Sequence, residues 1–120
     1  KVVLLEFKVG YAGYFALNHP TRFFSGPFRK RALALPLSVR NFARIQIWLA
    51  MMLLHRNYGV PYNMMEGYVI HAEAGKTPVH VTSARFIRDN EASIWRTMCK
   101  YRERTNKKKQ RQKQRQKQKK

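Results

Sequence analysis

The last fourteen residues, Lys107–Lys120, consist only of Lys, Arg and Gln, and nine of the fourteen are cationic. From Lys109 to Lys119 cations and Gln alternate almost strictly, with no carboxylate among them. The chemistry open to such a run is the binding of phosphate groups, because each neutralised phosphate releases its condensed counterions. The run has no apolar surface to bury, so we expect a polyanion to order it.

The rest of the chain is basic too. Its 106 residues carry 16 Lys and Arg against all six of the Asp and Glu, and no carboxylate lies between Glu6 and Glu66. A solvated surface ordinarily mixes both signs of charge, so this bias indicates a nucleic-acid footprint; the alternative is a basic, free-standing soluble protein. The predicted RNA-binding residues are Arg22, Arg29, Lys30, Arg31, Arg40, Arg44, Arg104, Lys107, Lys108, Lys109, Arg111, Lys113, Arg115, Lys117, Lys119 and Lys120.

Residues for catalysis or metal binding are few: four His, one Cys and six carboxylates, in no recognisable catalytic motif. His71 and His80 could face each other across a hairpin, but two ligands fall short of the usual three or four, and Cys99 has no spacing relation to them. We therefore expect no metal, no cofactor and no enzymatic activity. The His pair is expected to face solvent or RNA, and Cys99 to serve in packing.

A helix from about Val39 to Asn57 is predicted by its flanking residues. Ser38 is a suitable N-cap, and Gly59 stands where a left-handed C-cap belongs. The second half of this segment is apolar on every side, so it must be buried all round. We expect a partner subunit to cover part of it through Trp48, Met51 and Met52; burial in the chain's own core is the alternative.

Two strands, 68–74 and 77–83, are predicted to form a hairpin around a Gly75-Lys76 type II′ turn. That register pairs Ile70 with Val81 and Ala72 with Val79 on an apolar face. It pairs His71 with His80 and Val69 with Thr82 on a mixed face, which predicts a sheet with one solvated side. An earlier strand is predicted over residues 2–9, where β-branched and other apolar residues end at Gly10.

A second helix is predicted to begin at a cap formed by Asp89 or Asn90, with Ile94, Trp95, Met98 and Tyr101 on its packed face. Lys, Arg and Gln are good helix formers, so this helix is able to continue into the tail, although repulsion between cations four residues apart opposes it.

The fold class expected is α+β, a small domain with two main helices, a β-hairpin and a third strand near the N-terminus. The expected segments are the strand (1–9), an irregular basic and aromatic arm (10–37), the core (38–106) and the tail (107–120). In the arm, Phe23, Phe24 and Phe28 interleave with cations. They either stack on bases or, as aromatics more often do, anchor the arm by packing.

In this layout the chain resembles a ribosomal protein. The stretch from Ala34 to Ser83 (a helix, the residues NYGVPY, then a strand pair with a Gly-Lys turn) is similar to the large-subunit family beside the peptide exit tunnel. The resemblance implies a structural constituent of a ribosome that binds rRNA and other ribosomal proteins, with no small-molecule substrate. The Met- and Trp-rich helix and a first residue other than Met favour a mitochondrial ribosome, with a cytosolic one as the alternative.

A different class of function is an accessory subunit of a membrane-associated organellar complex. The apolar helix around Trp48 and the positive charge would suit anionic lipid headgroups. The longest apolar stretch, Ile45–Leu54, rises only about 15 Å as a helix, half of a bilayer core, so no membrane span is expected.

Overall fold

The computed structural model describes residues 1–10, 15–24, 26–29, 35–73 and 75–118. The strands are β1 (Val2–Val9), β2 (Met65–Ala72) and β3 (Val79–Thr82), and the long helices are α3 (Val39–Tyr58) and α4 (Arg85–Gln118). Two short 3-10 helices, η1 (Gly26–Phe28) and η2 (Tyr62–Met64), lie in the connections. The predicted α+β class is confirmed, and the N-terminal strand is part of the sheet.

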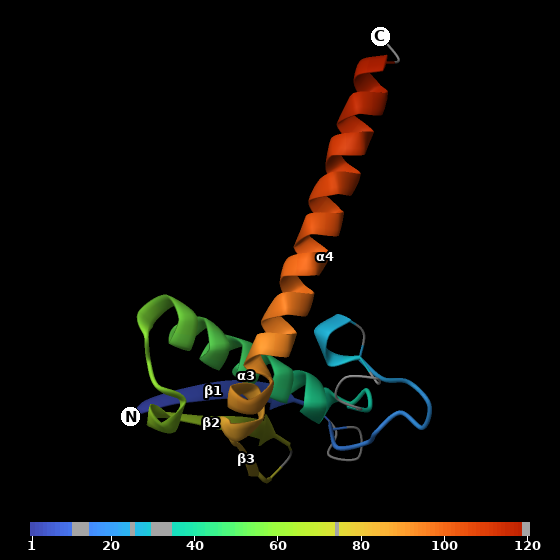
Figure 1. Cartoon of the computed structure of the whole chain (residues 1–120). Helices are drawn as coiled ribbons and strands as arrows, with labels where there is room; N and C mark the ends of the chain where they lie inside the picture. The colour runs from blue at the N-terminus through green and yellow to red at the C-terminus, as the bar shows by residue number, and fades with distance from the viewer. Residues whose placement is uncertain (11–14, 25, 30–34, 74, 119–120) are drawn as a thin grey trace.

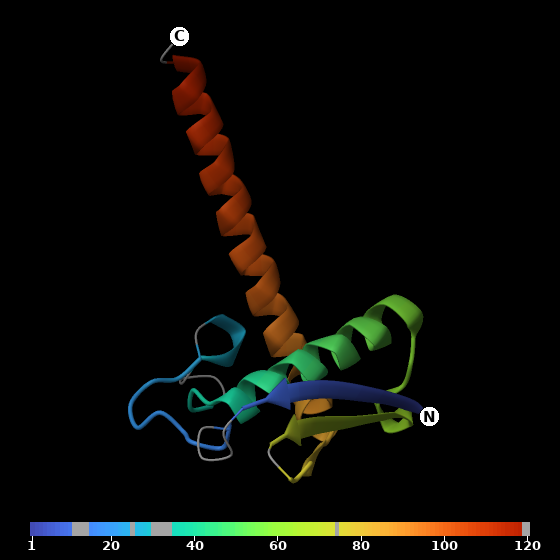
Figure 2. The ribbon, with the colours of Figure 1, turned by 180° about the vertical axis from the view of Figure 1, so that it is seen from behind.

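The sheet has the order β1-β2-β3. β1 runs parallel to β2, from the pair Val2 and Met65 to the pair Val9 and Ala72. Parallel neighbours need a long crossover connection, and here the arm and α3 provide it. Figure 1 shows α3 in front of the sheet, and Figure 2, from behind, shows β1 in front of α3, so α3 lies on one face.

The ends of α3 confirm the caps read from the sequence. The Ser38 hydroxyl accepts a hydrogen bond from the backbone N–H of Asn41 at 3.0 Å. Gly59 adopts φ 67°, and its N–H donates to the carbonyl of His55 at 3.0 Å. These local interactions satisfy backbone groups that a helix leaves unpaired at its ends, which is why the bounds could be predicted.

The apolar half of α3 corrects one expectation. Trp48, Met51 and Met52 are only 6%, 0% and 0% exposed, buried in the chain's own core rather than available to a partner. The β-sheet and α4 cover these three side chains, whereas Leu53 in the same half of the helix is 45% exposed. The Trp48 indole N–H donates to the Ser83 carbonyl at 3.0 Å, and its ring stacks on Phe86 of α4 with centroids 4.0 Å apart.

The hairpin forms, but its register differs by two residues from the one expected. Ile70 pairs with Val79, and Val69 pairs with His80. The turn is closed by backbone hydrogen bonds between Glu73 and Lys76, and Gly75 has φ 75°. Gly75 is therefore the second central residue of the turn, not the first as expected. Because the position of the turn sets the register of a hairpin, every strand pair shifts with it.

The two faces of the sheet are also used in the opposite sense to the expectation. The mixed face, with Val69 and His71, lies under α3, and His71 is 3% exposed. The apolar face is open, with Val79 and Val81 exposed to 56% and 69%. Gly67 explains the choice, because its lack of a side chain lets Ile47 and Met51 of α3 approach the mixed face.

Helix α4 begins at Arg85, ahead of the cap expected at Asp89 or Asn90. The Ser83 hydroxyl accepts a hydrogen bond from the Arg85 N–H at 3.1 Å and so supports the first turn. The buried residues Ile87 and Ile94 hold this end on the core. The helix then continues through the tail to Gln118 and projects from the body (Figures 1 and 2).

Candidate nucleic-acid interface

The outer part of α4 is a basic rod. Every residue from Tyr101 to Gln118 is exposed, and the only carboxylate among them is Glu103. The projecting helix gives the molecule a length of 62 Å against 34 and 27 Å in its other dimensions. Among the described residues only η1 lies against this part of α4, at its base, so phosphate groups can approach the cations from several sides.

Helical periodicity places eight of the ten cations between Lys100 and Lys117 in two stripes. At about 100° per residue, one stripe has spacings of four, four, three and four, and the other has spacings of four and four. Lys109 and Arg111, two residues apart, lie about 200° from each other around the axis. The first stripe is Lys100, Arg104, Lys108, Arg111 and Arg115; the second is Lys109, Lys113 and Lys117.

The arm adds to the base of the first stripe. A hollow where η1 meets α4 is lined by Arg29, Lys100, Tyr101 and Arg104, together with Gly26 and Thr97. Phe28 is buried and anchors η1, and the Arg29 N–H donates to the Gly26 carbonyl at 3.2 Å. Three cations and an exposed aromatic ring thus share one concave site, a combination suited to phosphate contact and base stacking.

The remaining predicted cations are divided between the arm, α3 and the tail. Arg22 is exposed. Its carbonyl accepts a hydrogen bond from the Leu37 N–H at 3.0 Å, which fixes the backbone of the arm at that point. Arg40 and Arg44 are half-buried on α3. Burial, with a smaller contribution from Arg40, lowers the pKa of Arg44. Lys30, Arg31, Lys119 and Lys120 lie outside the described residues.

The aromatic residues of the arm pack rather than stand free. Phe28 is buried, Phe24 packs against the core, and Phe23 forms a bridge with Pro36 across the arm. Their arrangement favours the packing interpretation over a stacking platform. Tyr101, expected on the packed face of the second helix, is instead 68% exposed on α4 and lies among cations.

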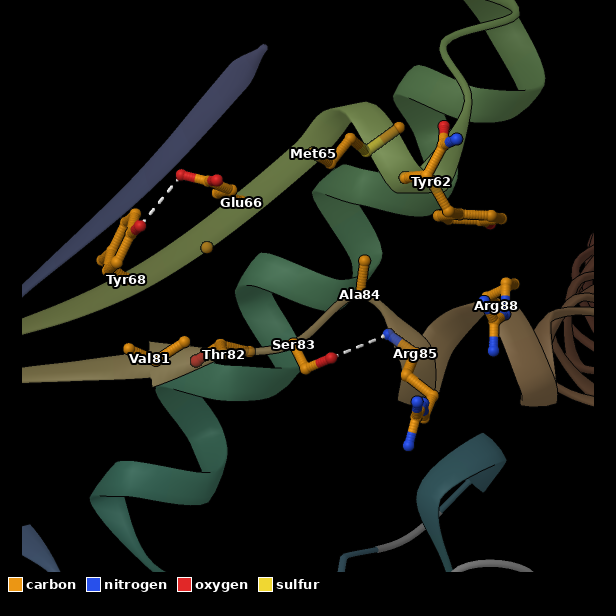
Figure 3. A pocket seen from close by; sticks show the side chains of 12 residues that line it. Tyr62, Met65, Glu66, Tyr68, Val81, Thr82, Ser83, Ala84, Arg85 and Arg88 are labelled. Atoms are coloured by element: carbon orange, nitrogen blue, oxygen red, sulfur yellow. Dashed lines mark hydrogen bonds between the residues drawn. The ribbon is translucent and has the colours of Figure 1, made fainter.

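A second hollow lies between the start of β2 and the start of α4, and its lining mixes charges (Figure 3). Glu66 lies on one side, and Arg85 and Arg88 on the other. The Glu66 carboxylate accepts hydrogen bonds from Lys1 Nζ at 2.7 Å and from the Tyr68 hydroxyl at 2.9 Å. These two partners lower its pKa, so Glu66 stays ionised in a structural pair instead of being poised for proton transfer.

The expected pairing of His71 with His80 across the hairpin is wrong, because His80 pairs with Val69. The His71 ring is buried and not solvated. Both rings contact Phe15: His71 is stacked at 4.3 Å between centroids, and His80 is tilted at 5.0 Å. Burial, then the charges of Arg40, Arg44 and His71, lower the pKa of His80. Among the described residues no three His, Cys, Asp or Glu side chains are grouped to hold a metal ion.

Sequence reasoning missed Lys100 and Tyr101 as members of the interface. The four-residue spacing from Lys100 to Arg104 and on to Lys108 could have indicated this, because it places the three cations on one face of a helix, with Tyr101 next to Lys100. The participation of Arg29 in the same hollow had no sequence signal, because it depends on how η1 docks on α4.

No helix within the described ranges is long and apolar enough to cross a membrane. Comparison with models of protein families, with characterised proteins and with solved structures finds no match to this chain.

Proposed function

We propose that this chain is a structural RNA-binding subunit of a ribosome. The observation that carries the proposal is the rod of α4, whose exposed outer half from Arg104 to Gln118 contains eight cations and no carboxylate. A helix this polar gains nothing from packing on a protein core. Its charges are best compensated by the phosphates of nucleic acid.

The two cationic stripes favour a particular mode of binding. Because they point to nearly opposite sides, the rod suits a position between two phosphate backbones, as in a junction or a widened groove of folded RNA. Phosphate contacts position a protein without reading base sequence. The proposed role is accordingly to clamp folded rRNA, and the mitochondrial ribosome is the proposed particle.

A protein neighbour is proposed to cover the open face of the sheet. Val3, Leu5 and Phe7 of β1 are at least half exposed there, beside Val79 and Val81 of β3. Within the three strands Glu66 is the only charged residue on this face, and Lys1 already pairs with it. The face lacks cations for RNA, and the net charge of +19 opposes docking of a second copy. A different protein with an apolar docking surface fits best.

Salt dependence of RNA binding tests the main proposal. Affinity for a folded rRNA fragment should fall steeply with salt, at roughly 0.7–0.9 log units per neutralised phosphate. Deletion of residues 107–120 should reduce the slope by several units. A matched control replaces the five tail Gln residues by Ala, which keeps the charges and the helix, and should leave the slope unchanged.

An unchanged slope after the deletion would refute the proposed role of α4. Sedimentation of native extracts without detergent separates the two classes of function. Migration with rRNA in the mitochondrial fraction supports the ribosomal proposal, whereas pelleting with membranes alone would favour the membrane-associated alternative.

A further inference from the structure

Two arginines of α3 have no carboxylate partner in this chain. All six Asp and Glu side chains lie in the described residues, and the ion pairs formed by four of them go to Lys1, Lys8, His55, Arg56 and Arg88. Glu73 lies in the hairpin turn and Glu103 on the rod, and neither forms an ion pair with Arg40 or Arg44. These half-buried guanidinium groups therefore have no carboxylate counter-charge among the described residues, and an external anion could supply one.

The course of α3 brings both arginines toward the β3 edge of the sheet, where their charges act on His80. The Trp48 indole is hydrogen-bonded to Ser83 at the end of β3, which fixes the helix against the strand. Arg44 and Arg40 lie one and two turns before Trp48, and α3 runs in the same direction as β3. They therefore follow the strand back from Ser83, past the inward-facing side chains of Thr82 and His80.

Three polar atoms along this strip are left unpaired. Arg40 Nε, His80 Nε2 and Thr82 Oγ1 are all buried and have no hydrogen-bond partner. Thr82 is only 2% exposed as a residue. Buried polar groups are almost always hydrogen-bonded, so three orphaned groups beside two uncompensated cations indicate a missing ligand.

The environment of His80 suits an anion. Its lowered pKa keeps the imidazole neutral at pH 7, and a neutral ring can donate one N–H to an oxyanion. Phe15 contacts the same ring at 5.0 Å and limits its movement. A hydroxyl, an imidazole and two guanidinium groups together form a donor-rich site with no acceptor charge, which matches a phosphate group.

We propose that Arg40, Arg44, His80 and Thr82 form a site for one backbone phosphate of bound RNA. The proposal rests on the RNA-binding function above, and it gives the body a contact separate from the rod of α4. The phosphate would draw the guanidinium groups toward β3 and supply the acceptors that Arg40, His80 and Thr82 lack.

The test uses the full chain and a folded rRNA hairpin. In Arg40→Gln/Arg44→Gln, the log–log salt slope should fall by about 0.7–0.9, the contribution of one phosphate, and affinity at low salt should fall about 10-fold. The matched control, Lys76→Gln/Arg85→Gln, removes the same charge elsewhere on the body and should change the slope by less than half as much.

A site-specific readout accompanies the affinity. The imidazole NMR signal of His80, assigned by its loss in His80→Gln, should shift when the RNA hairpin is added, and it should stay fixed in the double variant. If the double variant does not fold, Arg44→Lys, which keeps the charge but loses the fork of donors, should still reduce affinity.

Three outcomes separate the proposals. An unchanged slope and an unmoved His80 signal, with tail deletion still weakening binding, would overturn this site and leave the proposed function intact. A His80 shift with inorganic phosphate or anionic vesicles but not with RNA would overturn RNA as the source of the phosphate. If RNA binding is kept in both the tail deletion and the double variant, the phosphate site and the proposed RNA-binding function are both wrong.

Discussion

At the scale of single residues, Gly67 decides how the sheet is covered. A Cβ atom at this position would lie 2.6 Å from Ile47 Cγ2, 2.8 Å from Met51 Cε and 3.0 Å from the Thr82 carbonyl. The glycine is not needed for a left-handed conformation; it is needed because α3 packs so closely on β2 at this point. One missing side chain thereby selects the mixed face, and not the apolar face, for burial.

Gly67→Ala is expected to lower the free energy of unfolding by about 1–3 kcal/mol, because two side chains and a backbone carbonyl must move to admit the methyl group. Urea unfolding measures the loss. The control is Val81→Ala on the open face, which should cost less than about 1 kcal/mol. Equal losses in the two variants would contradict the packing of α3 on Gly67.

His80 should make stability depend on pH. Its pKa in the folded chain is lowered from 6.5 by burial, Arg40, Arg44 and His71. Below about pH 6.5 the unfolded chain therefore binds more protons than the folded one, and stability falls as the pH is lowered.

Urea unfolding at pH 7.5 and 5.5 checks this expectation. The free energy of unfolding should be lower at pH 5.5, and His80→Gln, which cannot take up a proton, should lose less across the same interval. An identical pH dependence in the variant would show that other groups cause it.

At the scale of elements, α3 and α4 have different sources of stability. Helix α3 is capped at both ends and buried along one face, so local signals and packing act together. Helix α4 is packed only over its first part, and its outer half rests on the propensity of Lys, Arg and Gln alone. Cations four residues apart, such as Lys109 and Lys113, weaken that half by about 0.2–0.5 kcal/mol per pair.

Deletion of residues 107–120 should remove helical circular dichroism without changing the unfolding midpoint of the body, since the deleted helix is fully exposed. In the full chain the helical signal should rise with salt, because screening weakens the repulsion between stripe members. The truncated chain supplies the control and should show little response to salt. A full chain with the same helical signal as the truncated one would contradict a helical tail.

At the scale of the whole molecule, charge and apolar surface are separated. Most of the Lys and Arg residues lie on the rod, the arm and α3, whereas the open sheet face carries Phe7, Val79 and Val81 with no unpaired charge from its strands. Exposed apolar patches of this kind ordinarily mark interaction surfaces. The separation agrees with a chain that contacts RNA on one side and a protein on another.

Phe7→Glu and Val81→Glu are expected to change the unfolding free energy by less than about 1 kcal/mol, because both side chains are mostly exposed. Each should nevertheless reduce co-sedimentation of the tagged chain with ribosomal particles, while affinity for an isolated rRNA hairpin is kept. Thr77→Glu, which adds the same charge at the hairpin turn, is the control. Unchanged incorporation of both variants would contradict a protein neighbour on this face.

The sequence by itself determined the features that depend on neighbouring residues. The bounds of β1, the caps of α3 at Ser38 and Gly59, and the presence of a hairpin all follow from local conformational preferences. The basic character of the chain is likewise a property of composition. Such signals act within a few residues, so they can be read without knowing the fold.

Only the tertiary structure decided which face of the sheet is covered, where Trp48, Met51 and Met52 are buried, and which cations meet. Arg40 and Arg44 lie close enough to His80 for their charges to lower its pKa, and Arg29 lines the same hollow as Lys100, although these segments are far apart in the chain. These arrangements depend on how closely two elements can approach, and the missing Cβ of Gly67 sets that distance for α3 and the sheet. The apolar pattern of a strand shows that its two faces differ, but which face is buried depends on the element packed against it.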